Sequence, residues 1–218
     1  MDLLLCLSEA YFDEFWAQKM ASREGVTTLD LRHLEGTHCY CDGSASDAIR
    51  AALSPFGPEG RHWIDTGDYH YLSLFWMEKV SEPFDLLLLD NHPDDQAPVF
   101  GEEILSCGSW VRKAQGSLPL LRQVFRNDAP PPSKLPLYIS VDLDVLSREW
   151  VRTDWSQGGM SLDDLELILT DAASKRRIIG ADICGGLTKD KGAAPQDLRL
   201  NVSTRERLLD ILERLSIS

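Results

Sequence analysis

Two short apolar runs that end in acidic residues constrain this chain most strongly. Leu86–Leu89 is followed by Asp90-Asn91-His92-Pro93-Asp94, and Tyr138–Val141 is followed by Asp142-Leu143-Asp144. Runs of this length and composition predict buried strands. Because alternate residues of an extended chain point the same way, we expect the polar side chains of each group to converge on one point.

The charge of these groups points to metal ions. Four carboxylates gathered in a buried pocket would repel one another strongly unless cations neutralised them, and two divalent ions carry the matching charge. A single Asp-x-Asp at a strand end is usually a solvated turn. Here two such motifs follow each other at the separation of a βα crossover, and one contains a histidine, which favours metal binding.

The order of the predicted elements indicates the fold class. Alternating strands and helices predict a single domain over residues 1–218, with three α/β/α layers around a mainly parallel sheet and ligands at the carboxyl ends of its strands. We expect Tyr11, Phe12, Phe15 and Trp16 to lie in the core. The predicted strands cover residues 3–7, 26–31, 61–65, 86–89, 138–142 and 177–183, and the predicted helices cover 9–20, 44–53, 70–80, 161–174 and 203–215.

Composition narrows the class of partner. With 35 acidic and 22 basic residues the formal charge is -13, which disfavours a nucleic acid or an anionic membrane and favours a small-molecule substrate. The five cysteines are scattered without a CxxC pair, and the first residues lack a basic segment. We therefore expect a reducing, cytoplasmic location without a disulfide framework, signal peptide or membrane span. A homo-oligomer is compatible with the sequence.

The pair of motifs resembles that of the arginase–agmatinase (ureohydrolase) family, whose distant relatives include the histone deacetylases. The resemblance covers roughly residues 63–186 and extends to Thr66-Gly67-Asp68-Tyr69-His70, where the family has a Gly-Gly-Asp-His turn. It implies the arginase–deacetylase fold and two divalent ions, for which Mn²⁺ is our first choice and Fe, Co or Zn are alternatives. By this resemblance Asp90 and Asp142 bridge both ions, His70 and Asp94 complete one, and His92 and Asp144 complete the other.

The resemblance also implies a reaction, the hydrolysis of a C–N bond other than a peptide bond. In the family a Glu three residues after a strand-ending Asp holds the guanidinium, whereas the matching segment here is Asp182-Ile183-Cys184-Gly185. Without that carboxylate a guanidinium loses a bidentate contact, so arginine is not the expected substrate. We expect an amidine, amide or guanidino-like bond instead, with Asp182 supporting the ligands.

A second departure concerns proton transfer. Arginases carry a His-Gly after the first motif, and the corresponding residues here are Cys107-Gly108. Cys107 is a candidate catalytic residue if the metals lower its pKa, although a small buried cysteine is the commoner explanation. We expect residues 145–159, with Trp150, Trp155 and Gln157, to line the pocket, and the aromatic residues of this loop could equally form a packed lid.

Other interpretations stay open. One is a catalytically silent relative that binds metal in a binding or regulatory role, and another is a deacetylase-like enzyme with one zinc ion. His33, His38 and His62 lack neighbouring ligands in the sequence and are interpreted as surface or core residues. Cys39 and Cys41 form no second pair, which argues against a metal site there.

Overall fold

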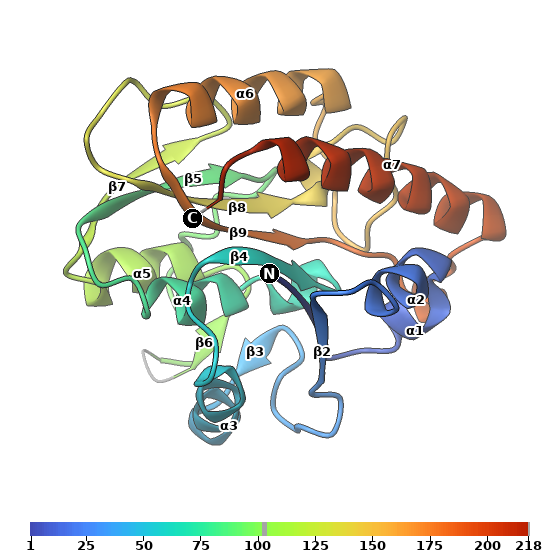
Figure 1. The fold of residues 1–218 in the computed structure, drawn as a ribbon. Helices are drawn as coiled ribbons and strands as arrows, with labels where there is room; N and C mark the ends of the chain where they lie inside the picture. Colours follow the sequence, from blue (N-terminus) through green and yellow to red (C-terminus); the bar gives the residue numbers. More distant parts are fainter. Residues whose placement is uncertain (102–103, 218) are drawn as a thin grey trace.

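The computed structural model describes residues 1–101 and 104–217, and its central element is a seven-stranded parallel sheet (Figure 1). The strand order across the sheet is β2-β1-β4-β9-β8-β5-β7, and a separate antiparallel pair joins β3 to β6. The strands are β1 (Asp2–Cys6), β2 (Val26–Asp30), β3 (Tyr40–Cys41), β4 (Gly60–Ile64), β5 (Phe84–Leu89), β6 (Leu105–Ser106), β7 (Leu121–Arg126), β8 (Leu137–Asp142) and β9 (Ile178–Cys184).

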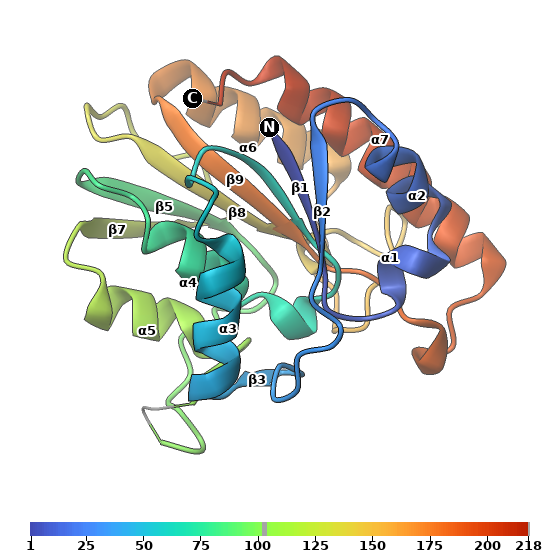
Figure 2. The same cartoon turned by 60° about the horizontal axis from the view of Figure 1, so that its bottom comes forward.

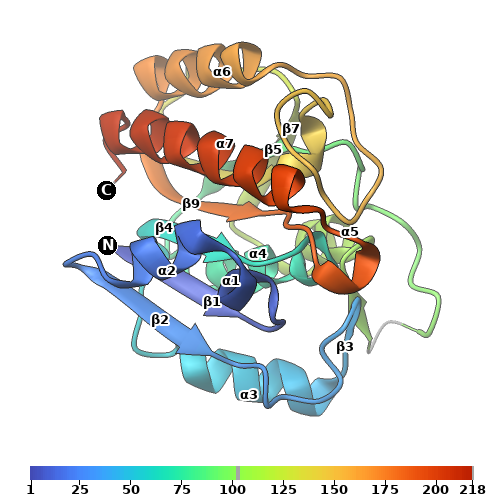
Figure 3. The same cartoon turned by 90° about the vertical axis from the view of Figure 1, so that its right-hand side faces the viewer.

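Helices cover both faces of this sheet, as Figures 2 and 3 show from two further directions. Helices α3, α4 and α5 pack against one face, while α1, α2, α6 and α7 pack against the other. The helices are α1 (Ala10–Asp13), α2 (Phe15–Ala21), α3 (Gly43–Leu53), α4 (Leu72–Met77), α5 (Trp110–Ser117), α6 (Leu162–Lys175) and α7 (Pro195–Arg214), with 3-10 turns η1 (Gly67–Tyr69), η2 (Leu143–Val145) and η3 (Lys189–Lys191).

The two covered faces explain the unbroken apolar runs. In β5, Leu86 and Leu88 enter the core on the α4 side, while Leu87 and Leu89 enter the core on the α6 side. A strand buried on both faces needs apolar residues at every position, because successive side chains point in opposite directions. The predicted α/β class with a parallel sheet is confirmed.

The predicted helix over residues 9–20 is wrong in one respect, because it is broken at Glu14. This residue is extended, with φ -101° and ψ 122°, and its buried carboxylate pairs with the buried guanidinium of Arg205 from α7. The break turns Phe12 and Phe15 outward, so that they are 42% and 70% exposed, whereas Tyr11 and Trp16 lie in the core as expected.

Other boundaries also differ from the prediction. Helix α7 begins at Pro195 rather than at 203, because proline suits the first helical position and Asp197 Oδ2 accepts a hydrogen bond from the amide of Ala194 at 3.3 Å. The segment 70–80 is helical only from Leu72 to Met77. Strand β7 and helix α5 were not predicted.

Within the described residues, no helix is both long and apolar enough to cross a membrane.

One core residue makes stability depend on pH. His62 in β4 is buried, its ring stacks on Trp76 with centroids 3.7 Å apart, and its Nδ1 lies 3.1 Å from the hydroxyl of Tyr138. Burial lowers the pKa of His62 from 6.5 to about 3. The folded protein therefore keeps this ring neutral at pH values where the unfolded chain binds a proton.

We predict that His62→Phe, which keeps a ring against Trp76, weakens the loss of stability in acid. In the wild type, His62 contributes to the free energy of unfolding. This contribution falls by about 1.4 kcal/mol per pH unit as the pH drops from about 6.5, the ordinary pKa of histidine, toward the lower pKa of His62 in the folded protein. Urea denaturation between about pH 4 and 7 measures this slope. Equal slopes in the two proteins would show that His62 does not titrate on unfolding.

Candidate metal centre

One imidazole faces three carboxylates at the carboxyl edge of the sheet. His70 follows η1 after β4, and its Nδ1 lies 3.3 Å from Asp90 Oδ2, 3.1 Å from Asp94 Oδ2 and 3.6 Å from Asp142 Oδ2. Asp90 and Asp94 follow β5, and Asp142 ends β8. Strands β8 and β5 are neighbours, and β9 separates β8 from β4, so three strand ends at one edge of the sheet deliver these four side chains to one buried point.

A second imidazole completes the group beside the first. His92 Nδ1 lies 2.8 Å from Asp144 Oδ2 and 3.6 Å from Asp90 Oδ1. Asp90 therefore has one oxygen near each histidine, which is the placement expected of a bridging ligand. The structure brings all six predicted ligands together.

The way in which they converge differs from the sequence prediction. The chain is not extended beyond the strand ends, because carboxylates fold it into turns. Asp90 Oδ1 accepts from the amide of His92 at 2.6 Å, and Asp142 Oδ1 accepts from the amide of Asp144 at 2.9 Å. Asp94 has a left-handed backbone with φ 48°, a conformation that Asp tolerates better than most residues.

The hydrogen bonds of His70 fix the tautomer of its neutral ring. Ser140 Oγ donates its hydrogen to Asp182 Oδ1 at 2.6 Å. Ser140 Oγ therefore accepts a hydrogen bond from His70 Nε2 at 2.9 Å. The hydrogen of a neutral ring then lies on Nε2, and the lone pair of Nδ1 points at the carboxylates. Asp182 thus has the supporting place expected of it, one residue removed from the ligand.

Two buried atoms in this centre lack hydrogen-bond partners among the described residues. They are Nδ1 of His70 and Oδ2 of Asp90, which face each other at 3.3 Å. Buried polar atoms are seldom left without partners. A cation between the nitrogen and the oxygens would satisfy both atoms, so the donor set fits divalent metal ions of the kind that imidazole and carboxylate bind.

The acidic groups perturb one another as an under-neutralised cluster should. Burial, followed by the charges of Asp142 and Asp90, raises the pKa of Asp144 to about 9, and burial beside Asp90 raises the pKa of Asp142 to about 6. Hydrogen bonding to Asp90 and the charge of Asp144 raise the pKa of His92 to about 9 despite its partial burial. Without metal, protons serve as the counter-charge, and cations compete with them.

Several supporting residues were missed from the sequence. Trp110 Nε1 donates to Asp94 Oδ2 at 2.7 Å. The side-chain amide of Asn127 accepts from the backbone amide of Asp90 at 2.9 Å and donates to the carbonyl of Asp90 at 2.8 Å. Ser156 Oγ lies 2.8 Å from His92 Nε2. These partners come from distant segments, and no local pattern marks them.

Cys184 was also missed, although alternation from Asp182 along β9 could have placed it. Its buried thiol lies 2.9 Å from Asp142 Oδ2, and it groups with His70 and Asp142 as a further candidate ligand set.

A pocket of about 210 Å³ opens above the cluster. Trp155 lines it as predicted, but Trp150 packs against the core and Gln157 bonds to carbonyls of its own loop, so those two expectations are wrong. Its wall consists of Cys39, Tyr40, Gly67, Asp90, His92, Asp94, Gln96, Ala97, Val99, Ser106, Cys107, Gly108, Asp142, Asp144 and Trp155.

Cys107 lies on this wall, but its environment opposes a thiolate. Hydrogen bonding to Cys39 and burial raise the pKa of Cys107 well above 9.0, so the metal-free pocket does not provide the activation that a catalytic role requires. All five cysteines are unpaired.

Known structures share this architecture. An arginase from Medicago truncatula superposes with a TM-score of 0.66 at 14% identity over 100% of this chain and 87% of its own, and a formimidoylglutamase from Bacillus subtilis with 0.64 at 14% identity over 99% and 87%. A triple mutant of a T. brucei arginase-like protein bound with Mn²⁺ gives 0.62 at 16% identity over 100% and 91%. The chain has the arginase–agmatinase (ureohydrolase) fold.

The comparison of sequences gives a partial match. An uncharacterised protein from Thermotoga maritima is 34% identical over 145 residues, which are 58% of this chain and 58% of that protein. The chain thus matches little more than half the length of that relative. No family model matches the chain.

We predict that replacement of Asp90 removes more metal than replacement of Asp94. After reconstitution with Mn²⁺, elemental analysis should find two ions per chain in the wild type and in the control Asp95→Asn, whose side chain is half-exposed beside the cluster. Asp94→Asn should lose one ion and Asp90→Asn both, because Asp90 lies near both histidines. Equal losses in these two variants would contradict a bridging Asp90.

Proposed function

We propose that this chain is a hydrolase that uses two divalent ions, physiologically Mn²⁺, to cleave a non-peptide C–N bond in a small molecule. The observation that carries the proposal is the buried Nδ1 of His70, which is unpartnered among the described residues and aimed at Asp90, Asp94 and Asp142. Catalytically silent surfaces do not need such a costly arrangement of buried charge.

The ligand assignment follows the two groups of side chains. His70 and Asp94 would hold one ion and His92 and Asp144 the other, with Asp90 and Asp142 between them. When bound, such a pair acidifies water to supply a nucleophile and stabilises negative charge that develops on the substrate. The protein's own part is to orient the ligands: Ser140 fixes the tautomer of His70, and Trp110 holds Asp94.

The pocket wall favours a neutral group over a guanidinium. Every carboxylate among its lining residues belongs to the metal cluster, and the remaining lining residues apart from His92 are uncharged. Gly185 has φ 98°, and a Cβ there would come within 2.6 Å of Asp142 Oδ1. A side chain at Gly185 would therefore disturb a metal ligand rather than reach the substrate. We infer that an amide, which is uncharged at neutral pH, suits this pocket better than an amidine, which is cationic like a guanidinium.

The test is a panel of amidines, ureas and acylated amines offered to the Mn²⁺-loaded protein. We predict turnover of at least one neutral member, and urea release from arginine well below about one per second. Asp142→Asn should abolish the activity, whereas Asp182→Asn should reduce metal affinity or activity by about 10–100-fold through misorientation of His70. Asp95→Asn serves again as the surface control.

Three outcomes would count against this account. Activity that is unchanged in Asp142→Asn would not belong to this centre. Turnover of arginine at ordinary enzymatic rates would overturn the inference of a neutral substrate. A fully loaded protein that turns over no member of the panel would contradict a hydrolase and favour a binding role.

A further inference from the structure

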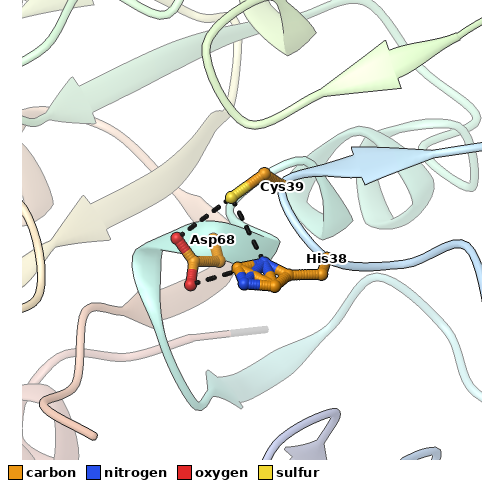
Figure 4. A group of neighbouring side chains, drawn as sticks. All are labelled: His38, Cys39 and Asp68. Atoms are coloured by element: carbon orange, nitrogen blue, oxygen red, sulfur yellow. Dashed lines mark hydrogen bonds and ion pairs between the residues drawn. The ribbon is translucent and has the colours of Figure 1, made fainter. Parts of the chain in front are cut away.

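A second group of ligating side chains lies beside the pocket and outside the six-residue cluster, and one of its members, Cys39, lines the pocket. Figure 4 shows His38 and Cys39, from the segment that leads into β3, facing Asp68 of η1. Cys39 Sγ lies 3.3 Å from His38 Nδ1 and 3.3 Å from Asp68 Oδ1, and His38 Nδ1 lies 3.8 Å from Asp68 Oδ2. Thiol, imidazole and carboxylate thus meet at one point.

These separations suit one small cation. In a tetrahedral zinc site, sulfur, nitrogen and oxygen ligands at their usual bond lengths lie about 3.3–3.6 Å from one another. The three contacts, at 3.3, 3.3 and 3.8 Å, are close to that range, and the longest of them involves the exposed ring of His38. A thiolate makes such a set softer than the histidine–carboxylate groups that we assign to Mn²⁺.

The surrounding charges leave room for a cation. The carboxylates of Asp68 and Asp154 are both buried, and Lys191 lies 3.4 Å from the first and 3.6 Å from the second. Trp155 Nε1 also donates to Asp68 Oδ1 at 2.9 Å, without adding charge. If a cation took Asp68, Lys191 would keep Asp154 as its partner. Two carboxylates share one ammonium here, so an added cation improves the local balance.

The pairing of β3 with β6 holds the backbone of Cys39 in place. The antiparallel register of Tyr40 with Ser106 places Cys39 opposite Cys107, and the amide of Cys107 donates to the carbonyl of Cys39 at 3.0 Å. Cys39 forms no disulfide and is only partly buried, so its thiol is accessible to a metal ion.

We propose that His38, Cys39 and Asp68 form a zinc-binding site beside the pocket, with a fourth position for a ligand that the protein does not supply. Binding exchanges the thiol proton of Cys39 for the Cys39–zinc bond and releases that proton to solvent, while His38 binds through neutral Nδ1. Three protein ligands with an open position can accept an anionic group from a molecule in the pocket. The site uses none of the six residues of the first cluster and does not depend on the proposed hydrolysis.

The test uses the full-length protein first loaded with Mn²⁺ and then titrated with Co²⁺ as a spectroscopic substitute for Zn²⁺. We expect a thiolate-to-cobalt charge-transfer absorption in the wild type that is absent from Cys39→Ser. The matched control is Cys184→Ser, which removes the thiol beside the first cluster and should keep the band. With Zn²⁺, the wild type should bind one ion more than Cys39→Ser, and His38→Ala should weaken affinity for that ion at least about tenfold.

The result that would overturn the site is the absence of the band in the wild type, or a band that survives Cys39→Ser. Loss of the band in Cys184→Ser alone would place the thiolate in the first cluster and also refute the proposal. Because the measured quantity is the difference between wild type and Cys39→Ser, it remains valid if the first cluster binds fewer ions than we propose.

Discussion

The excess of negative charge buried at the carboxyl edge of the sheet is the constraint on which the rest of the site depends. Asp90, Asp94, Asp142 and Asp144 are all buried, and two histidines face them. Even with both rings protonated, four carboxylates outweigh two imidazolium groups. The raised pKa values of Asp142 and Asp144 express the same imbalance, because burial and mutual repulsion make each carboxylate retain its proton. Divalent cations resolve it without requiring those protons.

The surrounding fold holds this charge in place. Ser140 and Asp182 lie in the adjacent strands β8 and β9, where they are paired in register, and together they orient His70 from β4. Close packing at Gly67 and Gly185 leaves no space for side chains beside Asp142. A side chain at either position would displace Asp142 or its neighbours, so both glycines belong to the geometry of this centre.

The sequence predicted those parts of the structure that local pattern determines. The apolar runs before Asp90 and Asp142 are visible because a strand buried on both faces favours apolar residues at successive positions, and the metal candidates stand directly after them. The turns that aim Asp94 and Asp144 were not predictable, since they depend on side-chain bonds to single amides. The helix break at Glu14 depends on Arg205, which lies 191 residues away.

The group of His38, Cys39 and Asp68 could not be predicted from the sequence either, because it also depends on long-range contacts. His38 and Cys39 meet Asp68 because β3 pairs with β6 and η1 follows β4, and the sequence separation of 29 between Cys39 and Asp68 matches no regular spacing. Long-range pairing of this kind leaves no periodic signal in the chain.

The most direct test of the central claim is a crystal structure of the Mn²⁺-loaded protein with an anomalous difference map recorded for manganese. The account predicts two peaks beside Asp90, one in contact with His70 Nδ1 and Asp94 and the other in contact with His92 and Asp144. A single peak, or peaks that leave His70 Nδ1 without a ligand bond, would contradict it.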